Sequence, residues 1–277
     1  MSIEERWAMV EGINTRYLEV GSGPPVLMLH GAQTFLSADI FTDVMEPIAD
    51  GGFRVIAYDQ PGYGLSDLPP DYTVSYRTTF VTKLMDVLGI ESAALVGHAQ
   101  AGGMVVRLAL SEPDRATAVV AVCNLTLVPP LPGASSARAR PERSAPSSSG
   151  PTLSGVRAEL EGDVYHKELI TPDVVERKHL LSMGKNATAA IRRARTHVPF
   201  HDAVPVWERL RDIRVPLLIL YGEEDRESMS ERARLLKRQQ PDLDIRVVPD
   251  ASHLLMWDAP HAFTASVLEC LAGMDKG

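Results

Sequence analysis

Hydrophobic residues occur along this chain in short runs with few polar interruptions. Six such runs, each of four or five residues, cover 26–29, 54–58, 93–96, 118–122, 216–220 and 245–248. They do not alternate with polar residues, and this is typical of strands that are buried on both faces, as in a parallel sheet. The pattern therefore predicts at least six buried strands.

Segments with a helical repeat lie between these runs, at 76–88, 104–110 and 261–271. In the first of them the apolar residues recur three and four positions apart and the repeat stops before Gly89, as expected for one buried face of a helix. Strands that alternate with helices predict an α/β fold with a mostly parallel, doubly wound sheet.

One stretch interrupts this alternation. Residues 129–155 are rich in Pro, Ser and Ala and contain few large apolar side chains, so they cannot bury enough surface to order themselves strongly. Helical patterning resumes near residue 156 and continues, with breaks, to about 210. We therefore predict a core at 1–128 and 206–277, with a helical cap inserted at 129–205 whose first part, 129–155, is mobile.

Composition narrows the range of partners. The 277 residues carry a formal net charge of −8, which argues against nucleic acid or an anionic membrane as the main partner. Two cysteines, Cys123 and Cys270, are too few for a disulfide scaffold and suit a reducing compartment. The first residues lack the pattern of a signal peptide, and no apolar run reaches the ~18 residues of a membrane span. We expect a cytoplasmic protein that binds a small-molecule substrate, and we leave a homodimer open.

The segment 97–103 carries the most informative motif. It joins a buried strand to an apolar helix and places Gly97 two residues before Ala99, in the arrangement of the nucleophile elbow G-x-S-x-G. The motif departs from that pattern twice: Ala99 stands at the nucleophile position, and Ala101 replaces the second glycine.

Two further strand ends carry residues that suit acid–base chemistry. Asp225 follows the run 216–220, and His253 follows the run 245–248. A carboxylate bonded to one ring nitrogen of a histidine fixes its tautomer and stabilises the imidazolium that forms during reaction. At a third strand end, the sequence His30-Gly31 permits a sharp exit that can leave backbone N–H groups free.

Together these segments resemble the α/β-hydrolase superfamily over essentially the whole chain. The resemblance rests on 30–31, 59–67, 97–103, 222–225 and His253. It implies an α/β-hydrolase fold in which Asp225 is the acid, His253 is the base, and the backbone N–H groups of Ala32 and Gln100 form the oxyanion hole. It also implies chemistry without a cofactor, and no metal-ligand spacing is present in the sequence.

Within the superfamily, the segments 165–175 and 253–257 resemble hydrolases of meta-cleavage products, which break a carbon–carbon bond in vinylogous diketones. This resemblance implies that Arg177 binds a substrate carboxylate. We also expect Gln33, Trp257 and Asn124 to contribute to substrate binding. Two alternatives stay open: Trp257 packs the last helix, and Asn124 forms structural hydrogen bonds. The sequence departs from that group at His98, where those enzymes have asparagine, and at Leu254, where they have tryptophan.

Alanine has no nucleophilic atom, so residue 99 cannot form an acyl-enzyme. We favour the interpretation that the chain is a Ser→Ala inactivated form of a serine enzyme. When a nucleophile is lost in evolution, the other residues of its site usually change too, whereas here Asp225, His253 and Gly97 are all present. An aspartate at this position, as in dehalogenases and epoxide hydrolases, is disfavoured because Gln33 stands where those enzymes usually carry proline. If alanine is native, His253 and Asp225 could act as a general base in a cyclase, a lyase or a cofactor-free oxygenase, or the fold could serve as a ligand receptor.

Overall fold

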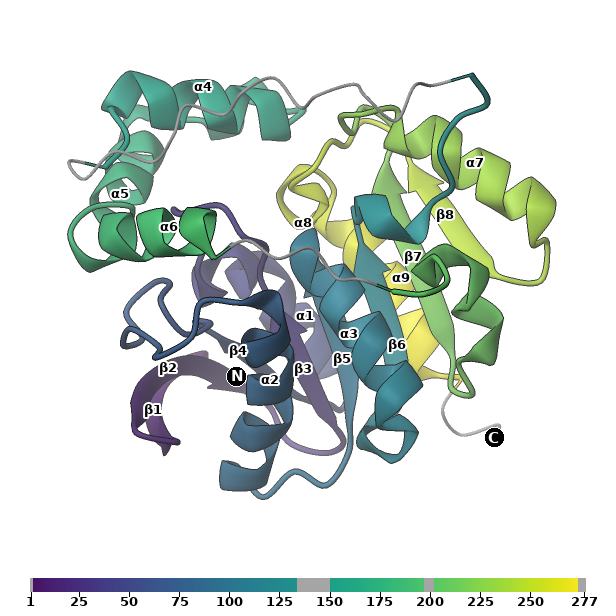
Figure 1. The fold of residues 1–277 in the computed structure, drawn as a ribbon, viewed down its shortest axis with the longest axis horizontal. Coiled ribbons are helices and arrows are strands. Elements are labelled where there is room, and N and C mark those ends of the chain that lie inside the picture. The colour runs from purple at the N-terminus through teal and green to yellow at the C-terminus, as the bar shows by residue number, and fades with distance from the viewer. Residues whose placement is uncertain (1, 134–149, 197–201, 274–277) are drawn as a thin grey trace.

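A computed structural model describes residues 2–133, 150–196 and 202–273 (Figure 1). Eight strands form one sheet in the order β1-β2-β4-β3-β5-β6-β7-β8, in which β1 pairs with β2 and β2 with β4 antiparallel and all other neighbours are parallel. The strands are β1 Glu4–Val10, β2 Ile13–Val20, β3 Pro25–Leu29, β4 Arg54–Tyr58, β5 Ala93–His98, β6 Ala116–Val122, β7 Leu217–Gly222 and β8 Asp244–Val248. The six predicted runs are thus β3 to β8, and the α/β-hydrolase fold class is confirmed.

The first two strands were not predicted, because their polar residues conceal the pattern. They form a hairpin whose two turn residues, Glu11 and Gly12, both have positive φ, at 48° and 81°. That conformation is typical of the two-residue turns that match the twist of a β-ribbon. In the sequence, the pair Glu11-Gly12 between two segments rich in strand-forming residues was the feature that indicated this hairpin.

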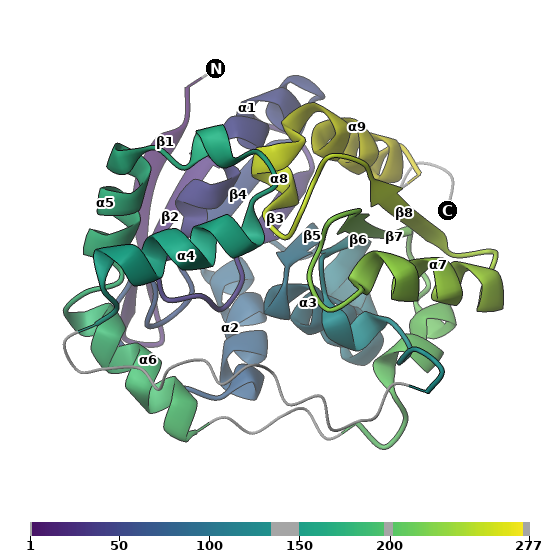
Figure 2. The same cartoon turned by 90° about the horizontal axis from the view of Figure 1, so that it is seen from above.

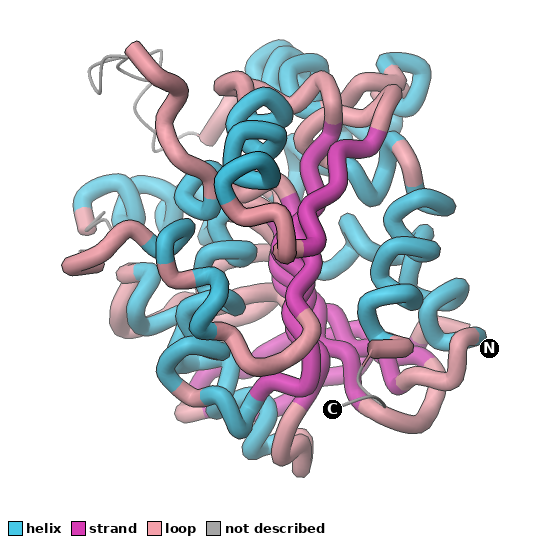
Figure 3. Tube along the Cα trace, turned by 90° about the vertical axis from the view of Figure 1, so that its right-hand side faces the viewer, coloured by secondary structure: helices cyan, strands magenta, loops and turns pink. Residues whose placement is uncertain are grey.

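Both faces of the sheet are apolar and both are covered by helices. Along β3, Val26 and Met28 face one side, where they join the core under α1 and α9, while Leu27 and Leu29 face the core under α2, α3 and α7. Figure 3 shows the strands as a central layer between two layers of helices. Alternate residues therefore face two different cores, and this explains why the runs show no polar alternation. The helices of the core are α1 Thr42–Asp50, α2 Val74–Val87, α3 Gln100–Ser111, α7 Met229–Gln239, α8 Leu255–Asp258 and α9 Pro260–Leu271.

Three further helices, α4 Leu153–Asp163, α5 Pro172–Leu181 and α6 Lys185–Arg195, lie together beyond one end of the sheet (Figures 1 and 2). They fall inside the predicted cap, whose boundaries at 129 and 205 stay a prediction. Most of the stretch expected to be mobile, 134–149, lies outside the described residues. In the part of the chain that the structure describes, no helix is long and apolar enough to cross a membrane.

The contact between β5 and α3 leaves no room for a side chain on the strand. A Cβ at Gly97 would lie 2.4 Å from the carbonyl oxygen of Ala101, so only glycine lets the helix approach the strand this closely.

We therefore expect Gly97→Ala to lower the free energy of unfolding by about 1–3 kcal/mol, because backbone atoms must shift to admit the methyl group. The matched control is Gly162→Ala on α4, where a Cβ meets nothing within 4 Å; it should raise stability by about 0.5–1 kcal/mol through helix propensity. Urea denaturation of both variants measures the difference. Equal effects of the two substitutions would contradict this account of Gly97.

Candidate active site

The turn at residue 99 holds its backbone in an unusual conformation. Ala99 has φ 51° and ψ −121°, between the end of β5 and the start of α3. Its N–H donates to the carbonyl of Val122 at 2.8 Å, and its own carbonyl accepts from Nδ2 of Asn124 at 2.5 Å. A positive φ outside glycine costs on the order of 1–3 kcal/mol and persists where the surroundings impose it, most often at functional sites. The turn thus has the conformation of a nucleophile elbow although its side chain is a methyl group.

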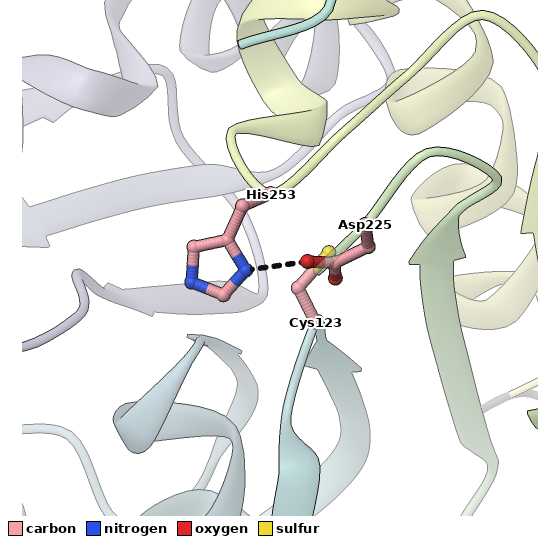
Figure 4. A group of neighbouring side chains, drawn as sticks. All are labelled: Cys123, Asp225 and His253. Carbon is pink, nitrogen blue, oxygen red and sulfur yellow. Dashed lines mark hydrogen bonds and ion pairs between the residues drawn. The ribbon is translucent and has the colours of Figure 1, made fainter. Parts of the chain in front are cut away.

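Asp225 and His253, the predicted acid and base, meet at the carboxyl end of the sheet. Asp225 follows β7 and His253 follows β8, and Oδ1 of Asp225 lies 3.0 Å from Nδ1 of His253 (Figure 4). Both residues are buried, at 6% and 2% exposure. An ionised carboxylate can only accept, so the ring carries its proton on Nδ1. Nε2 is then the basic nitrogen of His253.

The environment of Asp225 affects its protonation. Burial raises the pKa of Asp225 from 3.8 to about 6, while the thiol of Cys123 and the charge of Arg226 partly oppose this increase. Burial likewise raises the pKa of the Cys123 thiol well above its usual value, and the charge of Asp225 adds to that effect. Cys123 is therefore a neutral thiol packed beside Asp225 and His253. Because the thiolate is the nucleophilic form, Cys123 does not replace the missing nucleophile.

His98, which precedes the elbow, holds the backbone of the base. Its Nε2 lies 2.9 Å from the carbonyl oxygen of His253, and the two ring centroids are 5.0 Å apart. Burial, with a smaller contribution from the charge of His253, lowers the pKa of His98 to about 3. The ring is therefore neutral and donates from Nε2. His98 thus connects the turn at residue 99 to the base.

The two residues expected to form the oxyanion hole lie just after the neighbouring strands β3 and β5. Gln100 is the first residue of α3, where a backbone N–H has no partner inside the helix. Ala32 follows His30, and its carbonyl accepts from the Tyr63 hydroxyl at 3.4 Å. His30 in turn accepts from the backbone N–H of Gln60 at 3.1 Å, so the His30-Gly31 turn is fixed by the loop that follows β4. Their role as oxyanion donors stays a prediction.

Gln33 joins the loop after β3 to the end of α4. Its side-chain amide donates to Oδ2 of Asp163 at 2.5 Å, and Oδ1 of Asp163 forms an ion pair with Arg226 at 2.9 Å. Asp163 ends α4, and Arg226 follows the acid Asp225. The amide nitrogen of Gln33 is therefore engaged in a structural contact, and a contact with substrate stays untested.

The cap residue predicted to bind carboxylate is not the one that faces inward. Arg177 is exposed on α5, whereas the neighbouring Lys178 is buried and its Nζ lies 5.1 Å from the centre of the Trp257 ring. The helical repeat could have predicted that Lys178 faces inward, because it lies three positions after the buried Val175 and so on the same face of α5. Burial lowers the pKa of Lys178 to about 8, an effect that the charge of Asp39 opposes.

The two remaining substrate-binding candidates are engaged elsewhere. Both polar atoms of the Asn124 side chain are satisfied, by Ala99 and by Thr126. The indole nitrogen of Trp257 donates to the carbonyl of Ile40 at 3.1 Å. Both residues therefore stabilise the site, and a direct contact with substrate stays a prediction.

Within the described residues, one group of side chains could offer three metal ligands. It consists of Cys123, Asp225 and His253, whose ligand atoms lie within 4.8 Å of one another. A thiol must lose its proton to bind a metal, and the raised pKa of Cys123 opposes this. The arrangement is better suited to a hydrogen-bonded acid–base pair.

The pKa of Asp225 gives a testable dependence of stability on pH. The folded state holds the Asp225 proton more tightly than the unfolded chain, so this group destabilises the fold above pH 6, and its penalty disappears as the pH falls from about 6 to about 4. At about 1.4 kcal/mol per pKa unit, the full penalty is about 3 kcal/mol. We expect Asp225→Asn to unfold at higher urea concentration than the parent at pH 8, with the difference shrinking towards pH 4.5. A difference that does not vary with pH would contradict this.

Comparison with known proteins places this geometry in a family. A family model described as the alpha/beta hydrolase family matches residues 26–266. Among solved structures, 2-hydroxy-6-oxo-6-phenylhexa-2,4-dienoate hydrolase from Rhodococcus sp. strain RHA1 superposes with a TM-score of 0.79 at 19% identity, over 98% of this chain and 99% of that one. A serine hydrolase involved in carbazole degradation gives the same TM-score at 20% identity, over 98% and 99% of the two chains.

Curated relatives that match most of this chain include hydrolases. The 2-hydroxy-6-oxononadienedioate/2-hydroxy-6-oxononatrienedioate hydrolase of Burkholderia vietnamiensis is 27% identical over 279 residues, covering 94% of this chain and 91% of the relative. More identical matches are shorter: bifunctional epoxide hydrolase 2 of Mus musculus is 36% identical over 128 residues, and the match spans only 22% of that protein. The family match over most of the chain establishes that this protein belongs to the alpha/beta hydrolase family, whose members named here are hydrolases.

Proposed function

We propose that this chain has the active site of a cofactor-independent hydrolase of carbonyl compounds, with alanine in place of its nucleophile. The observation that carries the proposal is the buried, hydrogen-bonded pair Asp225 and His253, next to an elbow that keeps its positive φ at Ala99. Holding a buried carboxylate and a strained turn in place costs stability. Their joint presence is expected where both serve one reaction.

With a serine at position 99 the steps follow from the chemistry of the groups. The serine Oγ attacks the substrate carbonyl while Nε2 of His253 takes its proton, and Asp225 stabilises the imidazolium. The negative charge on the former carbonyl oxygen is held by the N–H groups of Ala32 and Gln100. His253 then returns the proton to the leaving group, and a water activated by the same histidine releases the acyl group.

We further propose that the bond cleaved is a carbon–carbon bond of a meta-cleavage product. Support comes from full-length relatives whose names specify 2-hydroxy-6-oxo-dienoate substrates, in Burkholderia vietnamiensis and, at 25% identity over 267 residues, in Burkholderia cepacia. The buried Lys178 beside Trp257 replaces Arg177 as the cap residue we assign to the carboxylate of such a substrate. Esters and lactones are the other carbonyl classes that the same site could accept.

The decisive experiment compares the chain as given with its Ala99→Ser variant on p-nitrophenyl esters, lactones and a vinylogous diketone. Restoring the nucleophile should raise kcat/KM on at least one class by a factor on the order of 10³ or more. A fluorophosphonate probe should label only the serine variant, as read by the mass of the intact protein.

A double variant, Ala99→Ser with His253→Ala, is the matched control. It keeps the new hydroxyl but removes the base, so both labelling and turnover should be lost. If the Ala99→Ser variant neither reacts with the probe nor turns over any of these substrates, the proposal is wrong.

A second candidate function follows from the same pair without a serine. His253 and Asp225 could activate water, or take a proton from the substrate itself, with no covalent intermediate. In that case the chain as given has activity, which His253→Ala abolishes and Ala99→Ser does not improve. A ligand receptor, in contrast, would keep its affinity in His253→Ala and show no turnover in any form.

A further inference from the structure

Two arginine side chains from different parts of the chain meet at one buried tyrosine. Arg77 comes from α2 of the core and Arg193 from α6, and their guanidinium carbons lie 5.4 Å and 3.8 Å from the centre of the Tyr63 ring. Tyr63, in the loop after β4, is fully buried, and Arg77 is 2% exposed. An aromatic face attracts a guanidinium, but it does not neutralise two of them.

Among the described residues, these arginines donate hydrogen bonds only to neutral acceptors. Arg77 donates to the side-chain oxygens of Gln60 and Gln100, and Arg193 donates to the carbonyl of Gly62 at 2.7 Å. Nε of Arg77 and Nη2 of Arg193 are buried without a hydrogen-bond partner. Among the ion pairs formed by residues 2–133, 150–196 and 202–273, none includes either arginine.

A buried positive charge on Arg77 and a half-buried one on Arg193, with no carboxylate partner among the described residues, are unfavourable together. The proximity is evident in the pKa of Arg193, which burial lowers and which the charge of Arg77 lowers further. Arginine stays charged under all conditions in which proteins fold, so the protein cannot relieve this cost by deprotonation. An anionic ligand would relieve it, since a guanidinium can bind a carboxylate through two parallel hydrogen bonds.

The pair lies beside the reaction centre. Arg77 contacts the side chain of Gln100, the residue after Ala99, and Tyr63 donates to the carbonyl of Ala32. These are the two residues assigned to the oxyanion hole. An anion bound by the pair would therefore lie next to the elbow, on the side where α6 covers the core.

We propose that Arg193 and Arg77, supported by Tyr63, form a subsite for a carboxylate group of the substrate, in addition to the contact assigned to Lys178. The substrate is then a carbonyl compound with an acidic group at the end bound beneath α6. This inference rests on the proposed function for its reaction, but the binding of a carboxylate can be measured without any turnover.

The kinetic test uses the Ala99→Ser variant with two esters that differ in charge, p-nitrophenyl butyrate and mono-p-nitrophenyl glutarate. We expect Arg193→Gln to lower kcat/KM for the anionic ester by about 10–100-fold, the effect of losing a charged hydrogen bond, and to leave the neutral ester within twofold. Arg193→Lys should recover part of the loss.

The matched control is Arg195→Gln. Arg195 is exposed in the same last turn of α6, so this variant removes an equal charge from the same helix and should not change the ratio between the two esters. Equal losses on both esters in Arg193→Gln, or the same change in ratio in Arg195→Gln, would overturn the subsite.

A binding experiment on the chain as given separates this inference from the proposed function. Glutarate should raise its melting temperature saturably at constant ionic strength, and Arg193→Gln should abolish the increase while Arg195→Gln retains it. If the serine variant is inactive on every substrate but this result is obtained, the reaction was wrongly assigned and the anion subsite stands. If sodium chloride stabilises the protein as much as glutarate does, the subsite is refuted.

Discussion

The close approach of α3 to β5 is the constraint on which the rest of the site depends. A Cβ at Gly97 would collide with the backbone of Ala101, and Ala99, between the end of β5 and the start of α3, has a positive φ. Asn124 and Val122 hold the turn from β6 and its following loop, so the strained conformation is imposed by neighbours and does not depend on the side chain at 99. This explains how an elbow can persist with only a methyl group.

Acidic side chains connect the base to the cap. Asp258 accepts from the backbone N–H groups of Ser252, Tyr165 and His166, at 2.8, 2.9 and 3.0 Å. The carbonyl of Asp163 accepts from Leu254 at 2.9 Å. The segment that carries His253 is therefore bonded at Leu254 to the end of α4, and at Ser252, through Asp258, to the residues that follow α4.

The distribution of charge differs sharply between the whole molecule and its site. The chain as a whole is acidic, with a formal net charge of −8, yet Lys178, Arg77 and Arg193 are side chains largely withdrawn from solvent near the carboxyl edge of the sheet. Charges placed in a poorly solvated region act more strongly than charges in water. These cationic groups agree with the anionic substrate proposed above.

Fold and acid–base pair could both be predicted from the sequence, because both depend on local order along the chain. Apolar runs indicated β3 to β8, and the elbow, Asp225 and His253 follow β5, β7 and β8, whose carboxyl ends a parallel sheet brings to one edge. The hairpin of β1 and β2 was not predicted, because the polar residues in these strands obscure the alternation of apolar and polar positions. Only the tertiary structure decided which cationic residue of α5 faces inward, that Gln33 binds Asp163 and that Asn124 binds the elbow. It also decided that Arg77 and Arg193, which are 116 positions apart in the sequence, share one tyrosine. These contacts join segments distant along the chain, and their geometry is set by how helices pack on the sheet, which no local pattern encodes.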